Sequence, residues 1–502
     1  MILHSAGPGL LLAAALAACA PAPPRAARGV RPEPVLPGTA APSVSAVATA
    51  AAPRFESVLL PGVPHVRQKP DFCGEAAAEM FLRKLGQPID QDLVFALSGM
   101  DPARGMGATT RELKTALERI GLRVGPVWHS VRADAAALRA LFAELHADLR
   151  RGVPSIVCMH YDERPQSTEH FRLVLGYDAA QDEVVYHEPA EDDGAYRRMP
   201  LARFLQLWPL KYDAAAWTVI RLRLDPGELV PADTLRASAP ARLAPASLAQ
   251  HIMELREKLP VGFSVRLEPP FVVVGDGPPE QVEASARHTV RWAVDLLKRD
   301  FFRADPAYVI DVWLFRDDQS YRRGAQYFFG EQPSTPYGYY SHRHRALVMN
   351  IATGGGTLVH EIVHPFMEAN FPACPAWLNE GLGSLYEQSS SRDGHIIGLT
   401  NWRLAGLQRA IREGKVPSFA TLAATTSEQF YDQDPGTNYA QARYLCYYLQ
   451  EQGLLVRYFG EVVAGHAADP TGYKTLQRVL AEPDMTAFQR KWERFVLGLR
   501  FP

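Results

Sequence analysis

Two stretches rich in alanine and proline interrupt the chain and limit how much of it can share one hydrophobic core. The first, residues 20–54, has almost no large apolar side chains, and the second runs from 225 to about 248. Segments of this composition bury too little apolar surface to offset the entropy lost on folding. Because a domain usually holds about 100–200 residues, we predict two globular parts, 55–224 and 249–502, joined by a linker at 225–248.

Both predicted parts mix helical and strand patterns, so the expected fold class is α+β with two domains. Apolar residues make up 47% of the chain, which is enough for a sizeable core in each part. Helical periodicity is found around 76–85, 138–149 and 280–299, and the end of the chain is expected to be mainly helical. The strand-like runs are 155–160, 171–177, 183–187, 217–224, 271–274, 309–315 and 346–351.

The charge balance argues against nucleic acid as a partner. Lys and Arg together number 53, and Asp and Glu number 55. A nucleic-acid-binding protein usually carries a clear excess of basic residues on one face. We therefore set that class of function aside.

The first residues have the pattern of a targeting segment. Leu10–Ala18 is an apolar run too short for a membrane span. The run ends in Leu16-Ala17-Ala18-Cys19, which resembles the lipobox of bacterial lipoproteins. The resemblance implies that a signal peptide, 1–18, is removed, that Cys19 is lipidated, and that residues 19–54 form a disordered tether to the outer membrane, facing the periplasm. The alternative is an ordinary cleaved signal followed by an incidental cysteine.

A histidine pair marks a candidate metal site in the C-terminal part. His360, Glu361 and His364 form the pattern H-E-x-x-H after three glycines. Histidines four apart lie about 40° apart on one helix face, so both imidazoles can reach one Zn²⁺. Glu361 can take a proton from a zinc-activated water. Pro365 follows directly and predicts that the helix kinks or ends there.

A zinc site of this kind needs a third protein ligand and an open fourth position. The best candidate is Glu380, which lies 16 residues after His364. Pro372 and Pro375 lie between them and predict a turn. A second helix can then return and present Glu380 to the same metal.

These residues resemble the gluzincin metallopeptidases, in which H-E-x-x-H is followed by a W-x-N-E-G segment, here Trp377–Gly381. The resemblance covers about 271–449. It implies that the strand 346–351 is the edge strand that pairs with a peptide substrate, and that Tyr439 stabilises the oxyanion. It also implies zinc ligation by His360, His364 and Glu380 and general-base catalysis by Glu361.

A second candidate site lies in the N-terminal part. Cys73 falls at the start of an amphipathic helix, where backbone N–H groups favour a thiolate, so a lowered thiol pKa is expected. Gln68 carries an amide that can donate to an oxyanion. His170 begins a strand and can serve as the base. Centring the following hairpin near residue 180 places Glu188 within a residue or two of His170, close enough to orient its imidazole.

This second pattern resembles the papain-like cysteine peptidases of the bacteriocin-leader-processing, or double-glycine, type. Gln68, Cys73 and His170 occupy the positions of that family's oxyanion, nucleophile and base residues, and Glu188-Pro189 stands where the family usually has Asp-Pro. The resemblance covers about 61–224. The alternative is a buried structural Cys73 beside a surface histidine.

The leading hypothesis is a membrane-tethered envelope peptidase with a zinc module and a cysteine-peptidase-like module, acting on a peptide or protein. The alternative is a lipid-anchored scaffold in which one or both modules bind without cleaving. The four cysteines after Cys19 are too widely and irregularly spaced for a disulfide framework.

Overall fold

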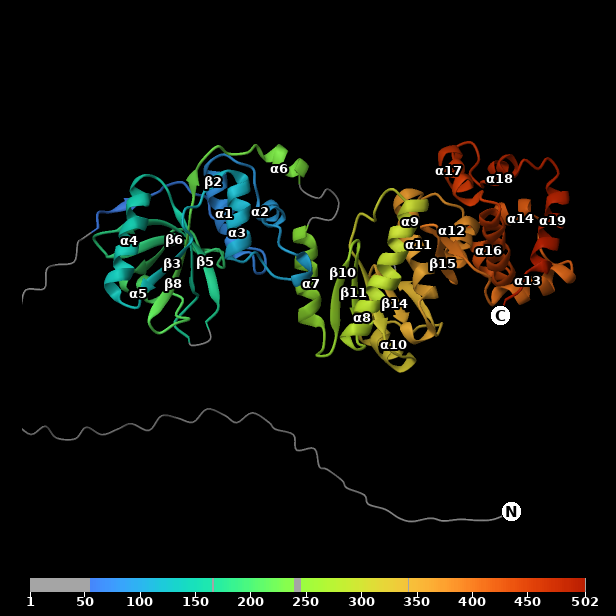
Figure 1. The fold of residues 1–502 in the computed structure, drawn as a ribbon, viewed down its shortest axis with the longest axis horizontal. Helices are drawn as coiled ribbons and strands as arrows, with labels where there is room; N and C mark the ends of the chain where they lie inside the picture. Colours follow the sequence, from blue (N-terminus) through green and yellow to red (C-terminus); the bar gives the residue numbers. More distant parts are fainter. Residues whose placement is uncertain (1–54, 165–166, 239–244, 342, 502) are drawn as a thin grey trace, which may run out of the picture. The chain divides into compact units, whose positions relative to one another are not determined.

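The computed structural model describes residues 55–164, 167–238, 245–341 and 343–501 (Figure 1). The expected signal peptide 1–18, the lipidated Cys19 and the tether 19–54 lie outside the described residues and stay predictions. The described chain mixes helices and strands throughout, so the predicted α+β class is confirmed.

The N-terminal part is built on a largely antiparallel sheet with the strand order β3-β8-β4-β5-β6-β7, to which β1 adds by pairing with β5. A separate pair, β2 with β9, runs antiparallel. The strands are β1 (Val58–Leu59), β2 (Leu122–Arg123), β3 (Trp128–Arg132), β4 (Ser155–His160), β5 (Glu169–Asp178), β6 (Glu183–His187), β7 (Arg197–Pro200), β8 (Ala216–Arg223) and β9 (Asp225–Pro226).

Helices cover both faces of this sheet, because apolar side chains alternate along its central strands. Ile156 and Cys158 of β4 join the core formed with α1, α2 and α3, whereas Val157 and Met159 join the core formed with α4 and α5. The helices are α1 (Cys73–Lys84), α2 (Gln91–Ser98), α3 (Thr110–Ile120), α4 (Ala135–Arg150), α5 (Leu201–Leu207) and α6 (Ala232–Ser238), with a 3₁₀ turn at Pro102–Arg104.

The C-terminal part contains a five-stranded sheet with the order β10-β11-β12-β14-β13. Strands β11, β12 and β14 run parallel, and β10 and β13 are antiparallel edge strands. These strands are β10 (Ser264–Glu268), β11 (Phe271–Gly275), β12 (Ile310–Phe315), β13 (Gly338–Ser341) and β14 (Ala346–Asn350), and a small hairpin is formed by β15 (Ser389–Arg392) and β16 (His395–Gly398).

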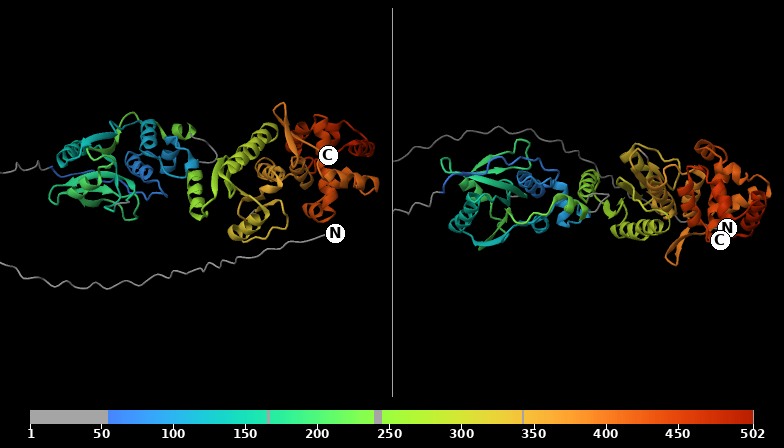
Figure 2. Two further views of the ribbon diagram at one scale, coloured as in Figure 1. Left: turned by 60° about the horizontal axis from the view of Figure 1, so that its bottom comes forward. Right: turned by 90° about the horizontal axis from the view of Figure 1, so that it is seen from above.

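Alternate residues of β11, β12 and β14 again contribute to two cores. One core includes α7 and α10, and the larger one includes α9, α11, α12 and the helices that follow (Figures 1 and 2). The helices are α7 (Pro245–Lys258), α8 (Pro279–Ser285), α9 (Trp292–Asp300), α10 (Asp318–Gly324), α11 (Gly356–Asn370), α12 (Ala376–Leu385), α13 (Arg403–Arg412), α14 (Phe419–Ala423), α15 (Ser427–Asp432), α16 (Pro435–Glu451), α17 (Leu455–Gly465), α18 (Tyr473–Leu480) and α19 (Met485–Gly498). π-Helical segments lie at Ala286–Arg291 and Ala325–Phe329, and a 3₁₀ turn at Ile351–Thr353.

The predicted linker, 225–248, is not without secondary structure. It holds β9, α6 and the first residues of α7. Within the part of the chain that the structure describes, no helix is both long enough and apolar enough to cross a bilayer.

Candidate active sites

The helix that carries the H-E-x-x-H pattern is α11. It begins at Gly356, where a Cβ atom would lie only 2.0 Å from the carbonyl oxygen of Glu387, so this close approach requires glycine. Pro365 lies inside the helix, which continues to Asn370. Of the two outcomes predicted at Pro365, a kink or an end of the helix, the end is therefore wrong. The proline removes a single backbone donor, and the fully buried Ile362 and Phe366 hold the helix against the core on both sides of it.

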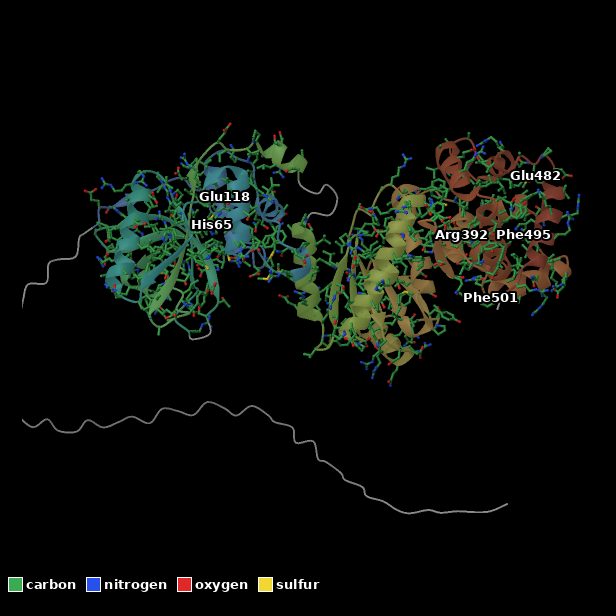
Figure 3. All side chains as sticks on the ribbon, viewed as in Figure 1. His65, Glu118, Arg392, Glu482, Phe495 and Phe501 are labelled. Atoms are coloured by element: carbon green, nitrogen blue, oxygen red, sulfur yellow. The ribbon has the colours of Figure 1, made fainter. Side chains whose placement is uncertain are left out.

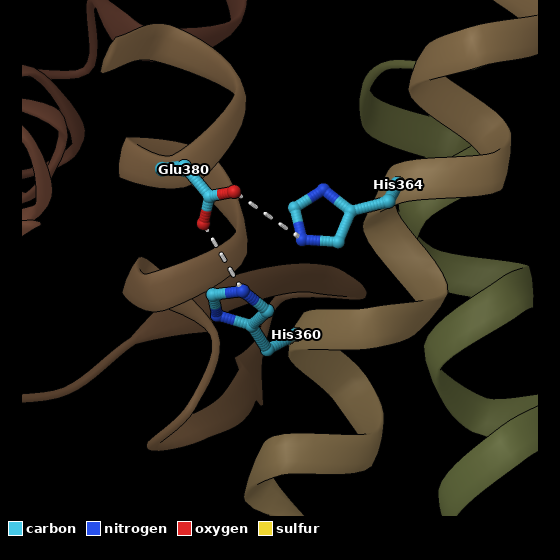
Figure 4. Close-up of side chains that lie close together, drawn as sticks. All are labelled: His360, His364 and Glu380. Atoms are coloured by element: carbon cyan, nitrogen blue, oxygen red, sulfur yellow. Dashed lines mark ion pairs between the residues drawn. The ribbon is translucent and has the colours of Figure 1, made fainter. Parts of the chain in front are cut away.

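The three predicted zinc ligands converge on one point (Figure 4). After α11 ends, the chain turns through Pro372 and Pro375, and α12 presents Glu380 to both histidines. His360 Nε2 lies 3.3 Å from Glu380 Oε2, and His364 Nε2 lies 3.9 Å from Glu380 Oε1. One ligand atom from each residue falls within 4.8 Å of the others, which is the arrangement that a tetrahedral zinc site with one open position requires.

The electrostatics of this cluster fit a cation. Oε2 of Glu380 is buried, and His360 Nε2 lies 3.3 Å from it, so a metal that bound both atoms would take the place of this ion pair. Burial lowers the pKa of His360, but the adjacent carboxylates of Glu380 and Glu387 outweigh burial and raise it to about 10. Burial raises the pKa of Glu380, yet the neighbouring imidazoles bring it down to about 2. The carboxylates thus favour positive charge at this point, which a Zn²⁺ would supply.

Further side chains fix the orientation of the two imidazoles. His364 Nδ1 lies 3.0 Å from Asn379 Oδ1, and His360 Nδ1 lies 3.4 Å from Glu387 Oε1. Glu387 is buried and is held by Arg403 through two contacts of 2.6 and 2.9 Å. When Nδ1–H donates to such a partner, Nε2 keeps its lone pair for a metal. Asn379 lies within the W-x-N-E-G segment and could have been predicted, whereas no sequence pattern points to Glu387.

A cleft of about 640 Å³ opens onto the three ligands. Glu361 lines it, as the predicted general base must. Tyr439, the predicted oxyanion residue, also lines it, together with Tyr431, which the sequence analysis missed. The Tyr431 hydroxyl donates to Glu380 Oε1 at 2.7 Å. Both phenols therefore stand beside the candidate metal site.

The edge strand of the sheet is not the one that was predicted. Strand β14 (Ala346–Asn350) is paired on both sides, by β12 and by β13, so it has no free edge. Of the two edge strands, β10 and β13, it is β13 whose residues Gly338, Tyr339 and Tyr340 line the cleft. The short β13 was missed because it holds one glycine and a serine, which dilute the strand signal.

In the N-terminal part, Cys73 is the first residue of α1, as predicted. The helix lies against β5, and the Cβ atom missing from Gly74 would lie 2.7 Å from Leu113 and 3.1 Å from Phe171. This close approach explains the glycine after the cysteine. The backbone of Phe171 is close enough to the Cys73 sulfur to lower the pKa of its thiol, so the sulfur lies near the residue that follows His170.

The hairpin β5–β6 brings Glu188 to His170, as we expected for a hairpin centred near residue 180. Leu173 pairs with His187, and Oε1 of Glu188 hydrogen-bonds to Nε2 of His170. Oε2 of Glu188 accepts a 2.6 Å bond from Arg172 Nε. Burial raises the pKa of Glu188, but these two partners hold it below its usual value. A charged carboxylate therefore orients His170 and leaves Nδ1 of the imidazole for another contact.

Gln68 is held by the backbone of Pro189, the residue after Glu188. Its backbone N–H donates to the carbonyl of Pro189 at 2.9 Å, and its side-chain Oε1 is buried without a hydrogen-bond partner. His65, labelled in Figure 3, contacts the carbonyl of Glu188 through Nε2 at 2.8 Å. The segment before Cys73 is thereby fixed to residues 188 and 189, directly after β6.

The predicted lowering of the Cys73 pKa is wrong for this arrangement. Burial of the sulfur, with smaller contributions from the carboxylates of Glu75 and Asp71, raises the pKa of Cys73 to about 12. Among the described residues, no hydrogen bond joins Cys73 to the imidazole of His170. All four described cysteines are free, and the resting thiol is protonated at neutral pH.

The N-terminal part thus carries a buried thiol at the start of α1 and a histidine–carboxylate pair on the β5–β6 hairpin. Residues 61–215 match the model of the Peptidase_C39 like family, so this part of the chain is a peptidase C39-like domain. The chain is also similar to the crystal structure of the peptidase domain of Streptococcus ComA, a bi-functional ABC transporter involved in a quorum-sensing pathway. The identity is 18%, the match covers 32% of this chain and 96% of that chain, and the TM-score is 0.22. No curated protein matches the sequence.

Proposed function

We propose that this protein is a peptidase with two catalytic modules, a zinc metallopeptidase in its C-terminal part and a cysteine peptidase in its C39-like domain. The peptidase C39-like domain implies a peptide or protein substrate. The zinc activity is carried by one observation: ligand atoms of His360, His364 and Glu380 lie within 4.8 Å of one another, at a cleft that Glu361 also lines.

In the zinc module the protein groups have separable roles. A Zn²⁺ held by the three ligands would activate water and polarise a carbonyl. Glu361 then accepts the proton of the attacking water and passes it to the leaving amine. Tyr431 and Tyr439 stand where they can donate to the oxyanion that develops on the scissile carbonyl. The free edge of β13 can pair with the extended substrate and align its backbone in the cleft.

In the cysteine module, the thiol of Cys73 attacks the scissile carbonyl while His170 accepts its proton. Glu188 holds the imidazole in place through Nε2 and stabilises the imidazolium that forms. Gln68 supplies an amide donor for the oxyanion. Burial raises the pKa of the thiol, so the proton passes to His170 as the sulfur attacks. The imidazolium of His170 then gives this proton to the departing amine, and water releases the acyl group from Cys73.

We also propose that Cys19 is lipidated and that the tether 19–54 holds both modules at the outer membrane, on the periplasmic side. This part of the proposal rests on the lipobox pattern Leu16–Cys19 alone. Metabolic labelling with a palmitate analogue tests it. Label that persists after Cys19→Ser would contradict it.

The variant Glu361→Gln tests the zinc activity, because it removes the base and leaves the three ligands in place. Purified full-length protein should cleave unfolded casein, and Cys73→Ala should leave a chelator-sensitive part of this cleavage. Glu361→Gln in the Cys73→Ala background should abolish that part while zinc content stays the same. Undiminished cleavage would refute the assignment of Glu361.

A second candidate function is favoured by the neutral thiol and by Glu188 in place of the usual aspartate. In this alternative the C39-like domain binds peptides without cleaving them, and only the zinc module is catalytic. Trapping of a thioester between Cys73 and an activated ester substrate would separate the two, since a binding module forms none.

A further inference from the structure

A second cleft, of about 440 Å³, shares one lining residue with the cleft at the candidate zinc site. That residue is Glu368 of α11, whose side chain is exposed. The second cleft is formed by the loop between α9 and β12 and by the residues of α11 around Glu368. Both clefts therefore reach the same carboxylate. The other residues that line the second cleft are Ala304, Asp305, Pro306, Ala307, Tyr308, Pro365 and Ala369.

Glu368 follows the two predicted zinc ligands of α11 along one side of the helix. His360, His364 and Glu368 are spaced four residues apart, so each lies about 6 Å further along the helix axis than the one before. An extended peptide advances about 3.3 Å per residue. A substrate side chain about two residues from a bond that is cleaved beside His364 is therefore within reach of the Glu368 carboxylate.

The carboxylate of Glu368 is also held in position. The hydroxyl of Tyr308 donates to Oε2 of Glu368 at 2.8 Å. Burial, and then contacts with Tyr340 and Glu368, raise the pKa of Tyr308, so this phenol keeps the proton that it donates. Tyr340 belongs to β13 and lines the zinc cleft. Two phenols thus connect Glu368 to the strand along which we propose that the substrate lies.

The two clefts are acidic. Their carboxylates are those of Glu361, Glu380, Asp305 and Glu368, and neither lining contains a described Lys or Arg. Glu361 and Glu380 have roles in the proposed zinc site, and Asp305 is paired with Lys298 at 2.6 Å. Within the part of the chain that the structure describes, no lysine or arginine forms an ion pair with Glu368. This carboxylate is therefore available to a cation from outside the protein.

The second cleft suits a long basic side chain. Apart from Asp305, Tyr308 and Glu368, its lining consists of alanine and proline. Lysine and arginine pack their apolar stems on such surfaces and keep the charged group at a polar partner. Arg345 of the protein itself does not take this place, because its guanidinium stacks on the Tyr308 ring, 4.4 Å from the ring centre.

We infer that Glu368 sets the specificity of the zinc module and pairs with a lysine or arginine side chain of the peptide substrate. That residue lies within about two positions of the cleaved bond. Its apolar stem packs in the second cleft, and its charged group meets the carboxylate that Tyr308 holds. This inference rests on the proposed zinc peptidase function.

The test compares kcat/KM for internally quenched peptides with blocked ends that carry Lys, Met or Glu at each position near the cleaved bond. It uses the Cys73→Ala full-length protein, so that only the zinc module is read. At one position, Lys should be preferred over Met by about tenfold, as expected for one hydrogen bond between charged groups. Glu368→Gln should abolish this preference, and Glu368→Lys should replace it by a preference for Glu over Met. High salt should reduce the preference for Lys, because it screens the attraction between charges.

Glu428→Gln is the matched control, because Glu428 is an exposed carboxylate on α15 outside both linings. It should leave the preference unchanged. No preference for Lys in the parent protein, or one that survives Glu368→Gln, would overturn the inference. If the protein cleaves none of the peptides, the proposed function fails instead. Binding of fluorescent versions of the same peptides, measured by polarisation on the parent protein and the three variants, then decides the inference by the same comparison.

Discussion

Replacing Glu387 by glutamine tests the proposed support of His360 most sharply. The substitution keeps the shape of the side chain and an acceptor for Asn401, but it removes the charge that holds Arg403. Loss of one member of a buried ion pair costs about 3–5 kcal/mol. The Arg403 side chain is 24% exposed, so the lower end, about 3 kcal/mol, applies. At about 2–4 °C per kcal/mol for a unit of this size, Tm of the C-terminal transition should fall by about 6–12 °C.

The unfolding measurement is made with a chelator present, so that zinc binding does not contribute. A separate competition with a fluorescent zinc chelator should show affinity reduced about 10–100-fold, the usual effect of losing a group that orients a histidine ligand. The matched control is Glu283→Gln, which breaks the half-exposed pair with Arg266 and should cost less than about 1 kcal/mol. Equal stability and equal zinc affinity of Glu387→Gln and the parent would refute the reasoning.

Three further predictions concern single groups. With zinc supplied at saturating concentration, Tyr431→Phe should lower kcat of the zinc module about 100-fold, since it loses an oxyanion donor; an unchanged kcat would assign that role to Tyr439 alone. Burial raises the pKa of Glu75 to about 8, so the folded domain holds this proton more tightly than the unfolded chain. The free energy of unfolding should therefore fall as pH rises from about 4.5 to 8, by at most about 1.4 kcal/mol per pH unit. Glu75→Gln should flatten this slope. Denaturant unfolding that gives parallel pH profiles for the variant and the parent protein would contradict the prediction. Cys73 should react with iodoacetamide at pH 8 at least about 100-fold more slowly than glutathione, because its thiol is neutral; rapid alkylation would show that His170 already holds the proton.

The sequence predicted the parts of both sites that depend on local periodicity. A helix places residues four apart on one face, so the alignment of His360 with His364 follows from spacing alone. A hairpin with a known centre fixes its register, so the approach of Glu188 to His170 could be deduced from the turn at 178–182. Strands β4 and β6 have the bounds that the apolar runs predicted.

What the sequence could not supply depends on contacts between distant segments. Glu387 reaches His360 and Arg403 only because α12 and α13 pack in the same core, and no spacing rule relates these residues. Tyr431 lies 51 residues after the carboxylate to which it donates. The high pKa of Cys73 results from burial against β5, which outweighs the local effect of the helix N-terminus. Strand order, which makes β13 and not β14 the edge, is likewise a tertiary property.

The zinc content of the purified full-length protein tests the central claim most directly. Mass-spectrometric metal analysis, after dialysis against zinc-free buffer, should find about one Zn²⁺ per chain. The double variant His360→Ala, His364→Ala should hold none, and the matched substitution His344→Ala, at a histidine outside the ligand cluster, should keep the metal. Zinc bound equally by the double variant and the parent protein, or a parent protein that takes up no zinc even when zinc is supplied, would contradict the account.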